Sequence, residues 1–150
     1  MDIKKRHVTW DEIEGYVNHI LFTMYKDNWK PDYIVGLTRG GLIPAVLASH
    51  KVDVPMHTLK VSLRDHQEHE ANWWMEDDAR EGKRILVIDD INDTGATINY
   101  IKENWTLNNL TYAVLINNEA SDADVDYSSV DINKRENDVW IVFPWEDWWK

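Results

Sequence analysis

Cysteine is absent from this 150-residue chain, which excludes a disulfide framework and any cysteine thiolate chemistry. Basic residues are also scarce, with 16 Lys and Arg against 27 Asp and Glu, and the formal charge is −11. Nucleic acids and anionic membranes both favour basic surfaces. The charge balance therefore argues against either of them as the main partner.

Long apolar runs are missing as well, and none approaches the length of a membrane span. Residues 1–6 are polar and no apolar segment follows them, so the sequence contains no secretory signal. We therefore expect a soluble, cytoplasmic protein. The length is enough for one domain with a real core, and we expect a single domain over residues 1–150.

What the sequence does contain is an alternation of helical and strand-like segments. Thr9 and Glu12 form a capping box, and the apolar spacing that follows predicts a helix over 10–26. Further helices are predicted at 42–48 and 98–105. Short apolar runs predict strands at 33–37, 57–63, 85–88, 111–116 and 139–143. The segment 117–137 is acidic and irregular, and we expect a loop with a short edge strand there. This alternation predicts an α/β fold, a mainly parallel sheet flanked by helices, with ligands at the carboxyl ends of the strands.

The most informative stretch is residues 84–97, RILVIDDINDTGAT. An apolar strand ends at Asp89 and Asp90, a third acid follows at Asp93, and Thr94-Gly95-Ala96-Thr97 leads into a helix. The loop amides and the helix N-terminus can hold an anion, and the two threonine hydroxyls can donate to its oxygens. An ordinary capped helix start would also explain Asp-Thr-Gly, because Asp and Thr are common caps.

A second candidate loop, Thr38-Arg39-Gly40-Gly41, follows the strand predicted at 33–37. The two glycines allow the backbone to approach a ligand closely, and Arg39 can neutralise an anion. Taken alone, this tetrapeptide is better explained as a plain turn between a strand and a helix. Its place one strand–helix unit before the acidic stretch is what makes it a candidate.

Residues 64–83 change character, because they are polar and lack clear periodicity. Connections of this length are usually functional or disordered. His66 and His69, with acidic neighbours, suggest a metal site. A solvated loop explains the same residues without a metal.

The acidic stretch resembles the 5-phosphoribosyl-1-pyrophosphate (PRPP) motif of type I phosphoribosyltransferases: four apolar residues, two acids, two spacers and Asp-Thr-Gly-x-Thr. Thr38-Arg39-Gly40-Gly41 resembles the pyrophosphate loop of that family, which often carries a non-proline cis peptide, here expected at Thr38–Arg39. The likeness to the short xanthine–guanine and hypoxanthine–guanine enzymes extends to residues 8–11 and 138–146, and so covers most of the chain.

The resemblance implies a type I phosphoribosyltransferase fold with a flexible hood at about 64–83 and a small C-terminal base-binding region. It implies a Mg²⁺-dependent transfer of phosphoribosyl from PRPP to a 6-oxopurine, namely guanine, xanthine or hypoxanthine. The products would be a nucleoside 5′-monophosphate and pyrophosphate, as in purine salvage. Both substrates are small molecules, and a homodimer or homotetramer is expected.

The resemblance also assigns roles to individual residues. Asp89 and Asp90 would engage the ribose hydroxyls and, directly or through water, the Mg²⁺ ion. Asp93 would be the catalytic group that handles the proton near the purine N7. The 5′-phosphate would be held by Asp93, Thr94, Gly95, Ala96 and Thr97. The pyrophosphate would be held by Thr38, Arg39, Gly40 and Gly41.

For the base, the resemblance points to Trp140, which would stack on the purine, and to Ile141, whose carbonyl would accept from it. A core aromatic in a strand would also explain Trp140. The family carries a lysine that donates to the 6-oxo group, where this chain has Asn118. Because an asparagine donates without charge, base choice is open. Two other readings are a regulator that binds PRPP or a nucleotide, and a transferase that acts on another acceptor.

Overall fold

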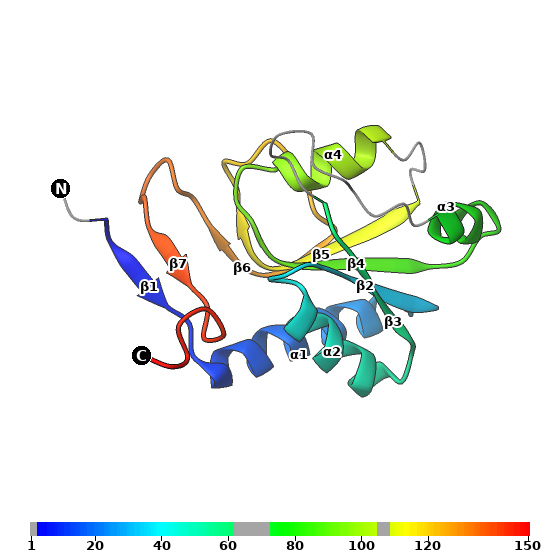
Figure 1. Ribbon diagram of the computed structural model, residues 1–150, viewed down its shortest axis with the longest axis horizontal. Coiled ribbons are helices and arrows are strands. Elements are labelled where there is room, and N and C mark those ends of the chain that lie inside the picture. The colour runs from blue at the N-terminus through cyan, green and yellow to red at the C-terminus, as the bar shows by residue number, and fades with distance from the viewer. Residues whose placement is uncertain (1–2, 62–72, 105–108) are drawn as a thin grey trace.

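The computed structural model describes residues 3–61, 73–104 and 109–150 (Figure 1). Its centre is a five-stranded sheet in the order β3-β2-β4-β5-β6, and all four neighbouring pairs are parallel. The strands are β2 (Tyr33–Leu37), β3 (Met56–Leu59), β4 (Ile85–Asn92), β5 (Leu110–Asn118) and β6 (Tyr127–Ile132). The predicted parallel sheet is confirmed, with β6 as the edge strand expected in the acidic segment 117–137.

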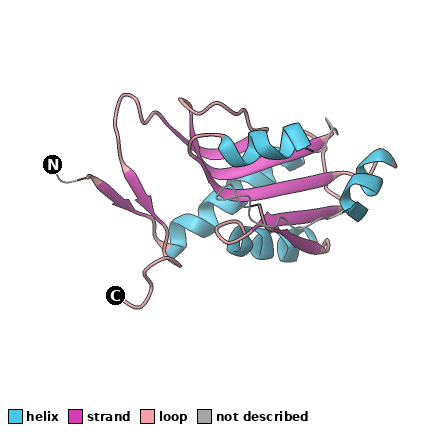
Figure 2. Cartoon of the chain, turned by 45° about the horizontal axis from the view of Figure 1, so that its top comes forward, coloured by secondary structure: helices cyan, strands magenta, loops and turns pink. Residues whose placement is uncertain are grey.

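Helices cover both faces of this sheet (Figures 1 and 2). One face carries α1 (Trp10–Lys26) and α2 (Leu42–Val52), and the other carries α3 (Trp73–Arg80) and α4 (Ala96–Asn104). Successive β4 residues serve the two faces in turn, since Leu86 and Ile88 pack with α1 and α2 whereas Ile85 and Val87 pack with α3 and α4. The strands are apolar because both faces are covered. No helix among the described residues is long and apolar enough to span a membrane.

The start of α1 follows from its predicted capping box. The Glu12 amide donates to Thr9 Oγ1 at 3.1 Å, and the Thr9 amide donates to Glu12 Oε1 at 3.1 Å. Five apolar residues at helical spacing then face the sheet: Ile13, Val17, Ile20, Leu21 and Met24. The predicted helix over 10–26 is confirmed at both ends.

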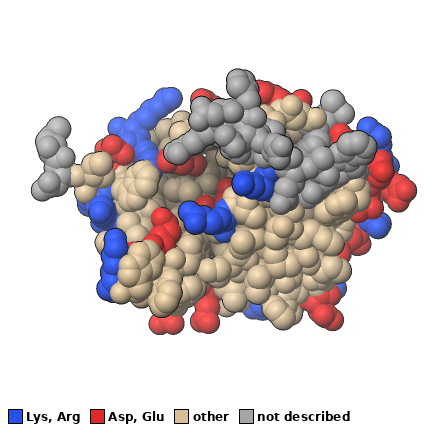
Figure 3. Space-filling view, in the orientation of Figure 1, with Lys and Arg blue, Asp and Glu red and all other residues tan. Residues whose placement is uncertain are grey.

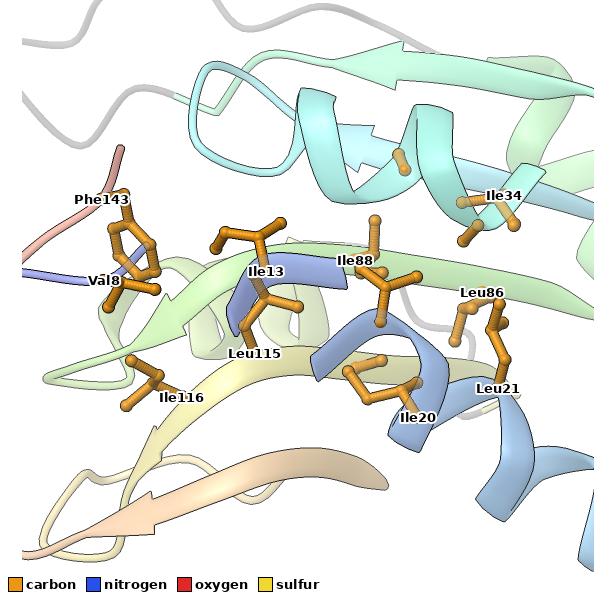
Figure 4. Close-up of a cluster of buried hydrophobic side chains, with 14 of the residues drawn as sticks. Val8, Ile13, Ile20, Leu21, Ile34, Leu86, Ile88, Leu115, Ile116 and Phe143 are labelled. Carbon is orange, nitrogen blue, oxygen red and sulfur yellow. The ribbon is translucent and has the colours of Figure 1, made fainter. Parts of the chain in front are cut away.

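A small second sheet extends the molecule on one side (Figure 1). It pairs β1 (Lys5–His7) in parallel with β7 (Trp140–Val142), so the two ends of the chain lie together. Val8 and Phe143 lie at one end of the main core, near Ile13 (Figure 4). The final strand was predicted, but its separation from the main sheet and its partner β1 were not. With three residues and no apolar alternation, β1 has no recognisable sequence signal.

The prediction of an aperiodic loop over 64–83 was wrong for its second half, because residues 73–80 form α3. Met75 and Ala79, one helical turn apart, are buried against the sheet and explain the helix. The turn after α3 contains Gly82 with a φ of 87°, a conformation that glycine adopts at no steric cost. Residues 64–72 of the predicted hood, with His66 and His69, lie outside the described residues.

Candidate active site

The carboxyl ends of β2 and β4 open into a cavity of about 650 Å³. Its lining comes from three parts of the chain: the turn after β2, the end of β4, and residues 134–149. The lining residues are Arg39, Gly40, Asp90, Ile91, Asp93, Lys134, Trp140, Ile141, Phe143, Trp145, Glu146 and Trp149. In the left half of the face shown in Figure 3, basic and acidic side chains lie next to one another beside a hollow. The structure thus brings together residues as distant in the sequence as Arg39 and Trp149.

The Arg-Gly-Gly turn is built for close backbone approach. The Thr38–Arg39 peptide bond is cis, as expected. A β-carbon on Gly41 would lie 2.3 Å from the Ile88 carbonyl oxygen, and one on Gly40 would lie 2.0 Å from Asp90 Oδ2. Arg39 is exposed at the cavity wall, and none of the ion pairs among the described residues involves it. The turn therefore presents a cation and a tight backbone to the cavity.

A smaller hollow of about 90 Å³ lies at the start of α4. It is lined by Asp89, Ile91, Asn92, Asp93, Thr94, Gly95, Ala96, Thr97 and Ile98. Gly95 has a φ of 90°, and a β-carbon there would lie 2.6 Å from the Ala123 nitrogen. Backbone amides at a helix N-terminus, with two threonine hydroxyls nearby, form a ready site for an anion. Ile91 and Asp93 line both hollows, so an elongated ligand can occupy the two together.

Asn92, which no sequence motif singled out, holds this loop in place. Its side chain is buried, and its amide nitrogen lies within hydrogen-bond distance of Asn117 Oδ1, Ser121 Oγ and the Ala123 carbonyl at 2.9, 2.8 and 2.9 Å. It occupies one of the two spacer positions of the PRPP-like motif. A buried polar residue among apolar strand positions is the only sequence signal for this role.

Asp89 and Asp90 do not face the same space. Asp89 lines the small hollow and Asp90 lines the large cavity, as expected for consecutive residues of a strand. Burial raises the pKa of Asp89 well above its ordinary value, and the adjacent Asp90 charge adds to this; burial likewise raises the pKa of Asp90. A bound cation would offset the cost of keeping these two neighbours ionised.

These carboxylates are suitable ligands for Mg²⁺, which binds through one or two carboxylates together with substrate oxygens. Among the described residues there is no group of three or more His, Cys, Asp or Glu side chains that could hold a metal. The donor set thus fits an ion that arrives with a phosphorylated ligand better than a permanent protein-only site.

Asp93 and Lys134 face each other in the large cavity, with Lys134 Nζ 3.1 Å from Asp93 Oδ1. Lys134 also lies over the Trp140 ring, 5.7 Å from its centroid. Its side chain is only 16% exposed. No motif in the sequence pointed to this lysine, which lies in the turn after β6.

Asn118 does not line the cavity, unlike the base-binding role that its sequence position suggested. It is buried at the end of β5, where its amide donates to the Asp93 carbonyl oxygen at 2.9 Å. Its Oδ1 accepts from the Lys134 and Ala120 amides at 3.0 and 3.2 Å. The short side chain is engaged by the backbone on both sides, so we replace direct base contact by a positioning role for Asn118.

The far wall of the cavity consists of β7 and the segment after it. Trp140 is 53% exposed and lines the cavity, so it is not a core aromatic. The Trp140 amide donates to the Lys4 carbonyl and the Val142 carbonyl accepts from Val8, so both groups point toward β1. Because these groups alternate along a strand, the N–H and C=O of Ile141 point to the opposite side. The wall therefore offers an aromatic face and a backbone edge that points away from β1.

The fold and the site together define a protein with two hollows at the carboxyl ends of parallel strands, each beside a loop that leads into a helix. The chain belongs to the phosphoribosyltransferase family, since the family's phosphoribosyl transferase domain matches residues 9–147. It is 27% identical over 150 residues to a xanthine-guanine phosphoribosyltransferase of Cereibacter sphaeroides (strain ATCC 17025 / ATH 2.4.3), covering 93% of this chain and 86% of the relative.

Two solved structures resemble the fold. A purine phosphoribosyltransferase from Pyrococcus horikoshii Ot3 has a TM-score of 0.73 and 25% identity, covering 95% of this chain and 94% of that one. A protein from Neisseria gonorrhoeae with bound ppGpp has a TM-score of 0.75 and 21% identity, covering 97% and 91%. These likenesses confirm the predicted phosphoribosyltransferase fold.

Proposed function

We propose that this protein transfers the 5-phosphoribosyl group of PRPP to a 6-oxopurine, giving a nucleoside 5′-monophosphate and pyrophosphate in purine salvage. The observation that carries the proposal is the pair of hollows that share Ile91 and Asp93. One suits a phosphate and the other has an aromatic wall. The similarity to xanthine-guanine and purine phosphoribosyltransferases supports a purine as the acceptor.

In this proposal PRPP spans both hollows. The amides of residues 93–97 and the hydroxyls of Thr94 and Thr97 hold its 5′-phosphate, while Arg39 and the Gly40-Gly41 backbone hold the pyrophosphate. Asp90 faces the cavity from β4 and accepts from the ribose hydroxyls, and Asp89 supports the same end from the side of the phosphate hollow. When bound, Mg²⁺ supplies positive charge that offsets the charge of the leaving pyrophosphate.

The base enters against the opposite wall. Trp140 stacks on the purine, and the Ile141 carbonyl, which points away from β1, accepts from its N–H groups. Asp93, at the junction of the two hollows, faces the purine N7 and takes up its proton as another ring nitrogen bonds to the ribose carbon. The reaction breaks the bond from C1 to pyrophosphate and forms the bond from C1 to the base nitrogen, through a cation-like transition state. Exclusion of water from the cavity protects that state.

The test is a base panel. The protein is incubated with PRPP, Mg²⁺ and each of guanine, xanthine, hypoxanthine, adenine and uracil, and pyrophosphate release is followed. Turnover with a 6-oxopurine is expected, and turnover only with uracil would point instead to another acceptor class. Asp93→Asn should lower kcat by about 100-fold or more while PRPP affinity stays within a few-fold. An unchanged kcat would remove Asp93 from this role.

The second candidate is a regulator that binds PRPP or a nucleotide without turnover. The observation that favours it is the fold likeness to the Neisseria gonorrhoeae protein with bound ppGpp. Tight PRPP or ppGpp binding by calorimetry, with no pyrophosphate release for any base, would support this candidate over the enzyme.

We further propose that residues 1–150 act as one domain, that the protein assembles as a homodimer or homotetramer, and that it works in the cytoplasm. Light scattering coupled to size-exclusion chromatography measures the assembly. A monomeric mass at micromolar concentration would contradict the oligomer.

A further inference from the structure

The feature that the proposed reaction leaves unexplained is Lys134. Its side chain is only 16% exposed, and its ammonium group lies in the cavity, 3.1 Å from the Asp93 carboxylate and 5.7 Å from the centroid of the Trp140 ring. Burying an ammonium has a solvation cost that a single ion pair offsets only in part. A lysine held in this place, against the wall that receives the base, suggests contact with the ligand.

The backbone holds Lys134 in register with Asp93. The Lys134 amide donates to Asn118 Oδ1, and the amide nitrogen of the same asparagine donates to the Asp93 carbonyl oxygen. The turn itself is closed by the Arg135 amide, which donates to Asn133 Oδ1 at 3.0 Å. Asn118 therefore links the loop that carries the carboxylate to the turn that carries the ammonium.

The two side chains give this edge of the cavity a defined polarity. An ammonium group has three donors and no acceptor, and Asp93 uses only one of those donors. The ionised Asp93 carboxylate only accepts. A ring that stacks on Trp140 thus meets an acceptor at Asp93 and donors at Lys134. The ligand that matches this edge carries a ring N–H beside an exocyclic C=O.

We propose that Lys134 is a specificity-determining residue that donates to the exocyclic oxygen of the base, and so selects a 6-oxopurine over a 6-aminopurine. The inference rests on the proposed function and deepens it. In a 6-oxopurine, the oxygen at C6 and the N–H at N7 match Lys134 and Asp93. A 6-amino group would place donors against the ammonium and leave its hydrogen bonds unmade, which weakens binding of a 6-aminopurine and so favours the 6-oxopurine. The charge expected at Asn118 is thus provided by another segment of the chain.

The test uses Lys134→Met, which keeps the apolar stem and removes the ammonium, and Lys134→Arg, which keeps the charge. Lys83→Met is the matched control, since Lys83 Nζ pairs with Asp78 Oδ1 at 3.2 Å away from the cavity. Each variant is assayed for kcat/KM with hypoxanthine and with adenine, which differ at C6. Thermal melting checks that each variant is folded.

Lys134→Met removes the partner of Asp93 as well, so kcat can fall for every base. The selectivity ratio between hypoxanthine and adenine is therefore the readout, and it should drop by about 10- to 100-fold, as for loss of one charge-assisted hydrogen bond. Lys134→Arg should recover part of the ratio, and Lys83→Met should leave it unchanged. A folded Lys134→Met protein with the wild-type ratio would overturn the proposal.

Equilibrium binding separates this inference from the proposed function. Calorimetry with IMP and AMP needs no turnover and probes the same atoms at C6. If wild-type protein turns over no base but binds IMP more tightly than AMP, and Lys134→Met loses that preference, the enzyme proposal fails and the role of Lys134 holds. If Lys134→Met retains the wild-type preference for IMP, the role of Lys134 fails whatever the turnover.

Discussion

Replacing Gly40 by alanine is expected to impair the use of PRPP while the protein stays folded. The added methyl carbon would lie 2.0 Å from Asp90 Oδ2 and 2.3 Å from its Cγ. The carboxylate is the group that can move, so it must turn out of its place in the cavity. In doing so it gives up the hydrogen bond that Asp90 Oδ1 accepts from the Ile91 amide at 2.8 Å.

The magnitude follows from two separate effects. Overpacking costs about 1–3 kcal/mol of folding stability. Alanine also lowers the conformational entropy of the unfolded chain, which stabilises the folded protein by about 0.4–1 kcal/mol; this gain applies because Gly40 does not have a positive φ, so alanine can adopt its conformation. The net loss of stability should be about 1–2 kcal/mol. Loss of one charged acceptor for the substrate costs about 1.5–3 kcal/mol, or about 10- to 150-fold in kcat/KM for PRPP.

The assay is the PRPP dependence of pyrophosphate release, with urea unfolding as the stability measure. Gly15→Ala is the matched control, since Gly15 lies in α1 with no atom within 4 Å of an added β-carbon. This control should gain up to about 1 kcal/mol of stability and keep its kcat/KM. A Gly40→Ala protein with wild-type kcat/KM for PRPP would refute the contact between the two loops or the role of Asp90.

Three further changes test other parts of the structure. Trp140→Ala should raise KM for the base by an amount equivalent to about 1–3 kcal/mol, with Trp140→Phe close to wild type in steady-state kinetics; an unchanged KM would exclude stacking. Asn118→Ala removes the partner of the Asp93 carbonyl and of the Ala120 and Lys134 amides, and should lower the free energy of unfolding measured in urea by about 2–4 kcal/mol. An unchanged free energy of unfolding would mean that water replaces the side chain. The hydrogen bond from the Thr9 amide lowers the pKa of Glu12, so Glu12→Gln should lower the free energy of unfolding by about 0.3–1 kcal/mol at pH 7. This difference between the two proteins should disappear as the pH falls through the lowered pKa, and a difference that does not depend on pH would contradict the role of the charge.

The fold was predictable because its local signals agree with its global arrangement. The apolar runs of β2 and β4 are short and buried on both faces, and the capping box at Thr9 marks the start of α1. The helix α3 was missed because its segment lacks a clear apolar period, and among its described side chains Met75 and Ala79 are the buried ones. The apolar pattern of a segment is a weak predictor of a helix when few of its side chains are buried against the sheet.

The residues proposed to hold the phosphate are visible in the sequence for a similar reason. Asp89 to Thr97 are contiguous, so their chemistry is visible in one stretch of sequence. The base end was less visible, since Trp140 and Lys134 meet Asp93 only after β5, β6 and β7 have been placed. The alternation of β7, which turns the Ile141 carbonyl away from β1, also depends on a strand partner that the sequence did not reveal.

Asn118 shows what a motif comparison alone cannot reveal. At that position the family carries a lysine that donates to the base, and this chain has an asparagine, which donates without charge and with a shorter reach. In the structure the same asparagine is buried and accepts from the amide of Lys134, which extends an ammonium into the cavity. A position that loses a charged group can keep its influence on the site by orienting another segment that carries one. For this acidic chain that matters, because Arg39 and Lys134 are the two basic residues among those described as lining the cavity.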